Sequence, residues 1–256
     1  MDRLHKAFAI ASVTILFFIA YPLLALTLSA NPHVFKDTLE SREALDALAL
    51  TVEAATTSTV ILLALGVPLA YLLSRFDFRG KNFVEALIDL PLVIPHAVVG
   101  IMILVAFGPR TGIGEALRNI GVVLENSYWA IVAAFAFVSA PLLIDSAKDG
   151  FASIDPYLEG VARCMGAGAS RVFMRISLPL ASRSILTGAL LAWARAMSEV
   201  GALLIIAYYP KTINVLIIEW FNTYGLKYAI SLTLLLLPVS IAVFVVLRAM
   251  LGWGKR

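Results

Sequence analysis

Residues 7–30 read AFAIASVTILFFIAYPLLALTLSA, and none of these 24 residues carries a charge. A helix crosses the hydrocarbon core of a membrane in about 20 residues, so this stretch is long enough to span it. The whole chain shares the bias: 61% of its 256 residues are hydrophobic, 14% are charged, and the mean hydropathy is +0.91. A soluble domain holds only about 45–50% apolar and about 25% charged residues. The sequence therefore indicates an integral membrane protein.

The same stretch has one alternative interpretation, a cleaved secretory signal. Arg3 and Lys6 precede it, and Ala30 offers a small residue for cleavage. The apolar part of such signals is only about 7–15 residues long. We therefore favour an uncleaved membrane helix.

Five further segments are long and apolar enough to cross a membrane as helices. The six predicted spans cover residues 7–30, 47–73, 84–107, 127–144, 184–209 and 228–251. The outer connections are expected to be short. We therefore expect an all-α integral membrane fold, with one transmembrane domain over residues 1–256.

The basic residues are divided unequally between alternate connections. Thirteen Lys and Arg fall on the side that carries both termini, and six fall on the other. Since cytoplasmic loops are enriched in Lys and Arg, both termini are predicted to be cytoplasmic. Aromatic residues near the span ends, among them Tyr128, Trp129, Tyr208, Tyr209 and Trp253, suit the headgroup level.

One cytoplasmic connection, residues 145–183, is much longer than the others, at 39 residues. Asp155 is a good N-cap, and Pro156 suits the first position of a helix. Gly166 and Gly168 are expected to end this helix, with Gly166 making a tight turn that favours positive φ. The loop is the one place where a partner could dock.

A second short helix is expected to follow in the same loop, beginning near Ser170. Arg171 and Arg175 would lie four residues apart on one face, with an apolar stripe on another. Leu178 and Pro179 are expected to end this helix before the next membrane span.

The loop resembles the EAA loop of binding-protein-dependent ABC importer permeases. That pattern is Glu-Ala-Ala, a glycine four residues after the second alanine, and Ile-x-Leu-Pro after nine more. The matching residues here are Glu159-Gly160-Val161-Ala162, Gly166 and Ile176-Ser177-Leu178-Pro179. The front of the motif is a variant, and Ala162 takes the place of the second alanine. The resemblance implies the type I ABC importer permease fold.

Membership of that family implies a homodimer of permeases, two copies of a separate ABC ATPase, and an extracytoplasmic binding protein. The ATPase would bind ATP and Mg²⁺, because the chain has no Gly-x-x-x-x-Gly-Lys-Ser/Thr phosphate loop. The resemblance implies that Glu159 pairs with a basic group on the ATPase; the alternative is a glutamate that only solvates the loop.

Two further stretches resemble the molybdate, tungstate and sulfate branch of the family. They are residues 89–96, Asp-Leu-Pro-Leu-Val-Ile-Pro-His, followed by Gly100, and residues 193–202, Trp-Ala-Arg-Ala-Met-Ser-Glu-Val-Gly-Ala. The Pro-His pair at residues 95–96 and the run Ile-Ala-Tyr-Tyr-Pro at residues 206–210 are most similar to archaeal tungstate/molybdate permeases. The resemblance implies import of molybdate or tungstate, with sulfate or thiosulfate as the alternative.

Charged residues inside the fifth predicted span need compensation, because an arginine near the bilayer centre costs about 2.5–3.5 kcal/mol. Arg195 lies about eleven residues into the span, and Glu199 follows four residues later on the same face. We favour a self-neutralised pair. The alternatives are that Arg195 contributes positive potential to an anion pathway, or that it pairs with Asp89 or Glu53.

The third predicted span contains two prolines, Pro91 and Pro95, which remove backbone donors and bend the helix. Such breaks are tolerated at membrane depth only where protein or a water-filled cavity satisfies the backbone. Our candidates for the translocation path or its gate come from the third and fifth predicted spans. They are Asp89, Pro91, Pro95, His96 and Gly100 of the third, and Arg195, Ser198 and Glu199 of the fifth. His96 either packs or contacts substrate.

Other classes of function fit less well. The single cysteine, Cys164, excludes an internal disulfide and a cysteine-built metal site, and we expect no metal or cofactor in this chain. The net charge of +3 is too mild to suggest nucleic-acid binding. No protease motif surrounds Ser139 or Ser198. An ATP-independent channel or secondary transporter is the closer rival, although it leaves the long loop unexplained.

Overall fold

The computed structural model describes residues 3–252, and within them all regular structure is helical. The long helices are α1 (Arg3–Leu28), α3 (Arg42–Arg75), α7 (Tyr128–Ala152), α10 (Leu178–Met197) and α13 (Leu226–Gly252). The shorter helices are α2 (Pro32–Glu40), α4 (Lys81–Asp89), α5 (His96–Phe107), α6 (Gly112–Asn119), α8 (Pro156–Cys164), α9 (Ala169–Val172), α11 (Leu203–Ile206) and α12 (Ile213–Tyr224). Trp253, Lys255 and Arg256, which entered the topology prediction, lie outside the described residues.

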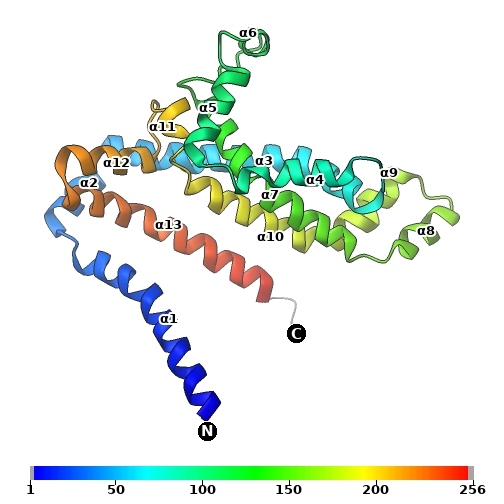
Figure 1. Cartoon of the computed structure of the whole chain (residues 1–256), viewed down its shortest axis with the longest axis horizontal. Helices are drawn as coiled ribbons and strands as arrows, with labels where there is room; N and C mark the ends of the chain where they lie inside the picture. The colour runs from blue at the N-terminus through cyan, green and yellow to red at the C-terminus, as the bar shows by residue number, and fades with distance from the viewer. Residues whose placement is uncertain (1–2, 253–256) are drawn as a thin grey trace.

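The centre of the molecule is a bundle of α3, α7 and α10, which lie side by side over most of their length (Figure 1). Small residues allow these helices to approach closely, as is common between membrane helices. A side chain at Gly188 of α10 would begin 2.8 Å from Ser146 of α7, and one at Gly150 of α7 would begin 2.5 Å from Ser184 of α10. The Ser146 hydroxyl also donates to the Ser184 carbonyl at 2.7 Å.

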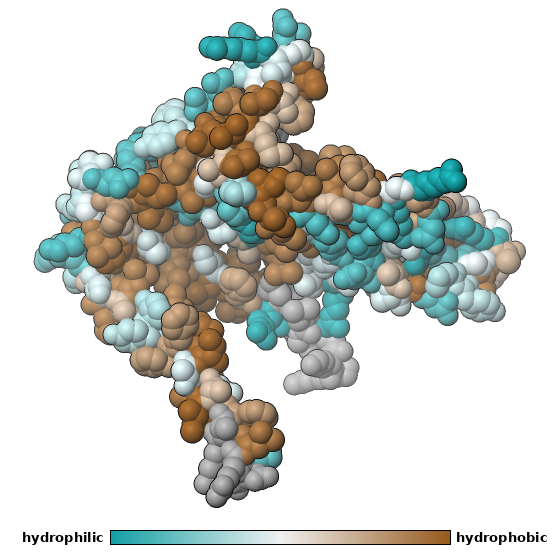
Figure 2. Space-filling view, in the orientation of Figure 1, coloured by the Kyte–Doolittle hydropathy of each residue, from teal (hydrophilic) through white to brown (hydrophobic). Residues whose placement is uncertain are grey.

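Helix α1 extends away from this bundle (Figure 1). Its apolar window, Phe8–Leu28, buries none of its residues against the rest of the chain. Most of the surface that α1 shows in Figure 2 is apolar. A helix of this composition needs lipid or another protein around it, which agrees with a membrane span.

The expectation of six spans fits the structure when the third, which was expected to bend at its prolines, is counted as one bent span. Within residues 3–252, five helices are long and apolar enough to cross a membrane, and a bent pair of helices brings the number to six if it forms one span. The third predicted span, residues 84–107, is two helical parts, Lys81–Leu92 and His96–Phe107, bent by 118°. A 3-10 turn at Leu90–Leu92 precedes the bend. Pro91 and Pro95 lie at this break, where neither residue can donate a backbone hydrogen bond.

The fifth predicted span, residues 184–209, is also interrupted. Helix α10 ends at Met197, the chain turns through residues 198–202, and the short α11 follows. Arg195 therefore lies in the last turn of α10 and not in the middle of a continuous helix.

The long loop is shorter than predicted, because both flanking helices continue into it. Helix α7 runs on to Ala152, and α9 is joined to α10 through a π-helical segment, Phe173–Ser177. The prediction that Leu178 and Pro179 end a helix is wrong: they begin α10. Proline needs no backbone donor in a first turn, and the wider π turn accommodates its ring. The outer connections were expected to be short, but they contain helices α2, α6 and α12.

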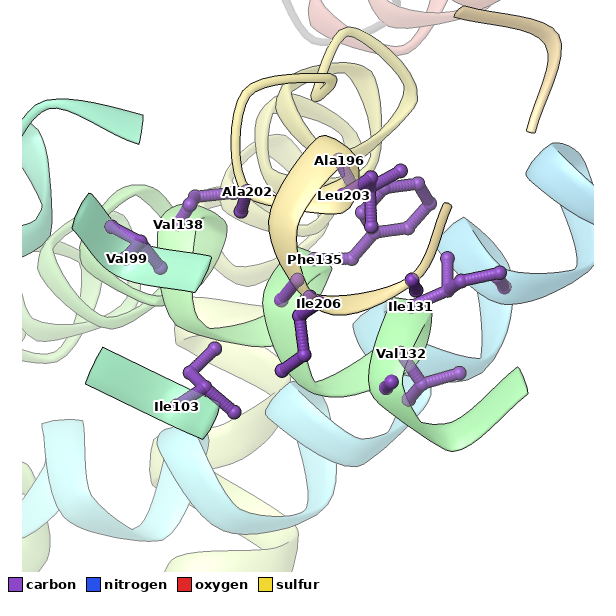
Figure 3. Close-up of a cluster of buried hydrophobic side chains, with 14 of the residues drawn as sticks. Val99, Ile103, Ile131, Val132, Phe135, Val138, Ala196, Ala202, Leu203 and Ile206 are labelled. Carbon is purple, nitrogen blue, oxygen red and sulfur yellow. The ribbon is translucent and has the colours of Figure 1, made fainter. Parts of the chain in front are cut away.

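The two interrupted spans pack against one another. Figure 3 shows Val99 and Ile103 of α5, Val138 of α7, and Ala202 and Ile206 at and within α11 gathered in one apolar cluster. The start of α5 is thereby held against the turn that ends α10.

Candidate functional site

The loop at residues 153–168 is built around α8. The Asp155 side chain accepts a hydrogen bond from the Tyr157 amide at 2.9 Å, so the predicted N-cap is present. Gly166 has φ +87°, in the left-handed region, as the tight turn requires. The Ala167 amide bonds back to the Ala162 carbonyl at 3.0 Å and closes the helix end.

Glu159 lies on the inner face of α8, where its side chain is only 5% exposed. Its Oε1 accepts bonds from Arg75 at 2.9 Å and from the Ser177 hydroxyl at 2.8 Å. Its Oε2 accepts a bond from the Tyr71 hydroxyl at 3.1 Å. Arg75 is 9% exposed and also donates to the Ile154 carbonyl at 3.3 Å. The carboxylate thus joins α8 to the end of α3 and to the π segment.

This geometry does not fit the expectation that Glu159 pairs with a basic group on another protein. Both carboxylate oxygens are bonded inside the chain, and the side chain is buried. The alternative, a glutamate that only solvates the loop, does not fit either. Burial alone would raise the pKa of Glu159, but hydrogen bonds from Arg75, Ser177 and Tyr71 outweigh it and hold the pKa below its usual value.

The outer face of the loop is apolar and exposed. Tyr157, Leu158, Val161 and Met165 all present large hydrophobic side chains to solvent. Arg171 and Arg175 line a polar hollow of about 580 Å³ beside Gly166 and Met174. In Figure 2 hydrophilic surface also gathers over the end of the molecule that carries α8 and α9. An exposed apolar face outside the membrane spans is typical of a docking surface.

The broken-helix cluster brings together side chains from the two interrupted spans. Arg195 Nη2 lies 3.0 Å from Glu199 Oε2, and it also lies within 3.0 Å of both ring nitrogens of His96. His96 Nδ1 lies 2.9 Å from the same Glu199 oxygen. Arg195 Nη1 donates to the Ser198 hydroxyl at 3.2 Å.

The turn at residues 198–202 is held by hydrogen bonds that replace those of a continuous helix. Glu199 Oε1 accepts the Ala202 amide at 2.9 Å. The side-chain amide of Asn214, in α12, donates to the carbonyls of Met197 at 2.7 Å and Glu199 at 3.1 Å. The Met197 and Glu199 carbonyls and the Ala202 amide therefore have hydrogen-bond partners within the protein, as membrane depth requires.

Two glycines make the close contact between the breaks possible. A side chain at Gly100 would begin 2.5 Å from the Ala202 carbonyl oxygen, and one at Gly201 would begin 2.6 Å from the His96 Cβ. Both distances are too short for real atoms, so only glycine fits without movement.

The favoured pair of Arg195 and Glu199 is therefore present, and the alternative partners are not used. Asp89 is exposed at the end of α4, and Glu53 is exposed on α3. Sequence reasoning missed Arg75, Tyr71, Asn214 and Gly201. Arg75 is one of the thirteen basic residues on the side of the two termini, and no local pattern connects it to a residue 84 positions later.

A further ion-pair group lies toward the other end of the bundle from α8 and fixes the segment after α11. Lys211 lies 2.7 Å from Glu219 of α12 and 3.0 Å from Glu43 of α3. Its hydrogen bond to Glu219 is the largest influence that raises the pKa of Lys211, which reaches about 12.

Comparisons with known proteins agree with this architecture. The molybdate/tungstate transport system permease protein of Pyrococcus furiosus is 44% identical over 257 residues, covering 100% of this chain and 98% of that protein. The protein of the same description from Methanocaldococcus jannaschii is 40% identical over 249 residues, covering 97% of each.

Among solved structures, a bacterial alginate ABC transporter in complex with a periplasmic protein superposes with a TM-score of 0.74. The identity is 18%, over 99% of this chain and 94% of that chain. At this identity the likeness shows the fold alone, which is that of ABC importer permeases.

Residues 62–252 match the family described as binding-protein-dependent transport system inner membrane component. This match covers most of the chain, and the archaeal relatives extend it to the full length. The chain belongs to the family of binding-protein-dependent transport system inner membrane components.

Proposed function

We propose that this chain is the membrane permease subunit of an ATP-driven importer for molybdate and tungstate. The observation that carries the proposal is identity of 44% over the full length of a molybdate/tungstate permease protein. The interrupted helices agree with it, because transporters use broken spans to line a path through the membrane. In this role the chain translocates its substrate and leaves ATP hydrolysis to another subunit.

The partner ATPase is proposed to dock on the loop at residues 153–168, the coupling loop of this proposal. Helix α8 is capped at both ends and is tied to α3 through Glu159, so it is a rigid element with an apolar outer face. A short helix of this kind suits a groove on another protein. Two ATPase copies, each binding Mg²⁺ and ATP, would act on a homodimer of this chain surrounded by lipid.

The orientation follows from the same assignment. With the coupling loop on the cytoplasmic side, both termini are cytoplasmic, and the excess of Lys and Arg on that side supports this. The opposite side would receive the oxyanion from an extracytoplasmic binding protein, as in the superposed alginate transporter, whose description includes a periplasmic protein.

Reconstitution into liposomes tests the proposal. The chain is combined with its cognate ATPase and binding protein, and uptake of labelled molybdate and tungstate is measured. We expect uptake to need both ATP and the binding protein, to survive collapse of ion gradients, and to resist competition by excess sulfate. Effective competition by sulfate would favour a sulfate permease instead, and uptake without ATP would favour a secondary transporter or channel.

Docking through α8 has its own test. Replacing Tyr157 with glutamate places a charge on the apolar outer face and should greatly reduce copurification of the ATPase. Replacing the exposed Phe83 of α4 with glutamate is the matched control and should leave copurification unchanged. Equal copurification of both variants would contradict docking at α8.

A further inference from the structure

The broken-helix cluster exposes polar groups on a membrane-spanning part of the chain. The side chain of His96 is 48% exposed and that of Arg195 is 22% exposed, and Ser198 is exposed as well. A charged side chain in a membrane protein almost always faces the bundle interior or a water-filled cavity, because contact with lipid tails is costly. The third and fifth spans are both interrupted here, and a helix break at membrane depth is likewise tolerated only where it is buried in protein or lines a water-filled cavity. This face therefore opens onto water or onto a second copy of the chain.

The acid of the cluster lies behind the donors. Glu199 is 1% exposed, and its oxygens are held by the Ala202 amide, by Arg195 and by His96. It cannot turn outward without breaking the turn at residues 198–202. The groups that reach the open side are a guanidinium, an imidazole and a hydroxyl. The guanidinium and the imidazole carry N–H donors, whereas the Ser198 hydroxyl donates to the Arg195 carbonyl at 2.8 Å and has to turn away from it to donate to an anion. This polarity suits an anion and disfavours a metal cation.

Helix α5 adds to this polarity. It begins at His96 with no side-chain cap, so its positive end lies within the cluster. Arginine is well matched to tetrahedral oxyanions, because its planar fork presents several donors at once.

We propose that Arg195, His96 and Ser198 form a transient contact site for a tetrahedral oxyanion on its way through the permease. The proposal rests on the proposed import of molybdate or tungstate and names where the anion touches the chain. Glu199 offsets the charge of Arg195, so binding stays weak. Weak binding is what a path requires, because an anion held tightly would not leave.

The reconstituted complex tests this site through the number of tungstate ions imported per ATP hydrolysed. In the Arg195→Met variant this ratio should fall about tenfold or more, and Arg195→Lys should fall less because one charge remains. Arg248→Met, at an exposed position near the end of α13, is the matched control and should keep the wild-type ratio. A ratio for Arg195→Met within twofold of wild type overturns the proposal.

A second variant covers the case in which Arg195→Met fails to assemble. The double variant His96→Gln and Ser198→Ala leaves the pair of Arg195 and Glu199 intact, so the turn keeps its main contacts. We expect its ratio to fall about threefold or more, and an unchanged ratio overturns the proposal. If the wild-type complex imports neither tungstate nor molybdate, the proposed function fails instead.

Thiol labelling tests separately whether the cluster faces water. Cys164 is the only cysteine of the chain and is replaced by serine, and Ser198→Cys then supplies a single thiol at the cluster. In the assembled complex a water-soluble thiol reagent should modify this cysteine, and millimolar tungstate should slow the reaction. No modification, with or without a non-hydrolysable ATP analogue, or modification at the same rate with tungstate, overturns the proposal.

Discussion

Two buried glutamates of this chain each lie against an arginine, but their surroundings differ. Glu159 joins three segments that are far apart in sequence, and both it and Arg75 are nearly inaccessible. Glu199 is bound mainly by near neighbours, the side chain of Arg195 and the amide of Ala202, with His96 as the distant partner. Arg195 and His96 remain partly open to another molecule.

The difference separates a structural connection from a contact site. A buried carboxylate is stable only when hydrogen bonds and an opposite charge compensate it, and both clusters meet that condition. The charge of Glu159 is compensated by Arg75, Ser177 and Tyr71, and both the glutamate and Arg75 are nearly inaccessible. The charge of Glu199 is compensated by Arg195 and His96, whose side chains remain partly exposed. The first cluster therefore fixes α8, whereas the second keeps side chains accessible to another molecule.

The largest effect is expected from opening the closed cluster. Arg75→Met leaves the charge of Glu159 buried without its main partner, which should cost about 3–5 kcal/mol. Arg163 is the matched control: it lies 3.9 Å from the same carboxylate but is 53% exposed. Arg163→Met should cost less than about 1 kcal/mol. Unfolding of the purified chain in detergent, followed by fluorescence, measures both. Equal losses would show that the cluster is not closed.

Lowering the pH should release the same interaction more gently, because it neutralises only the glutamate. The pKa of Glu159 is lowered in the folded chain, so its contribution to stability is complete above the usual range of a glutamate, about 4.3. The contribution is lost as the pH falls through the lowered pKa. The stability difference between wild type and Glu159→Gln should therefore shrink on acidification. A difference that stays constant from neutral to acidic pH would contradict this.

Local sequence patterns were enough to predict the features that involve residues close together in the sequence. The cap at Asp155, the turn at Gly166 and the pair of Arg195 and Glu199 all involve residues within a few positions of each other. Runs of apolar residues along the sequence were enough to locate the apolar segments, because the hydropathy of a segment depends only on its own residues.

What the sequence could not show depends on contacts between distant segments. The turn at residues 198–202 contains no proline, and it persists because Asn214 bonds the carbonyls that a continuous helix would have used. Hydropathy marks where an apolar segment ends and not where its helix ends. The prediction therefore ended the fourth span at residue 144, whereas α7 continues to Ala152. The role of Glu159 was misjudged because its partner lies at the end of another helix.

The open cluster should be sensitive to the spacing between its two backbones. Gly201→Ala would place a methyl group 2.6 Å from the His96 Cβ and force α5 away from the turn. Such overpacking should cost about 1–3 kcal/mol and should also lower tungstate uptake. Gly168→Ala, where nothing lies within 4 Å of the new carbon, is the matched control. Normal uptake by Gly201→Ala would show that the position of His96 does not matter.

Glycine has a different purpose at the coupling loop, where conformation and not space is limiting. Nothing lies within 4 Å of a side chain added at Gly166, but its φ of +87° is unfavourable for other residues. Gly166→Ala should cost about 1–2 kcal/mol. Gly160→Ala, in the helical part of α8 with equal space around it, should instead stabilise by about 0.5–1 kcal/mol. Because Glu159 still holds α8 to α3, the loss in Gly166→Ala should appear as weaker coupling of ATP hydrolysis to transport while α8 stays in place. A loss of stability in Gly166→Ala together with a gain in Gly160→Ala would show that the loop depends on its turn. Stability changes of the same sign in both variants would show that it does not.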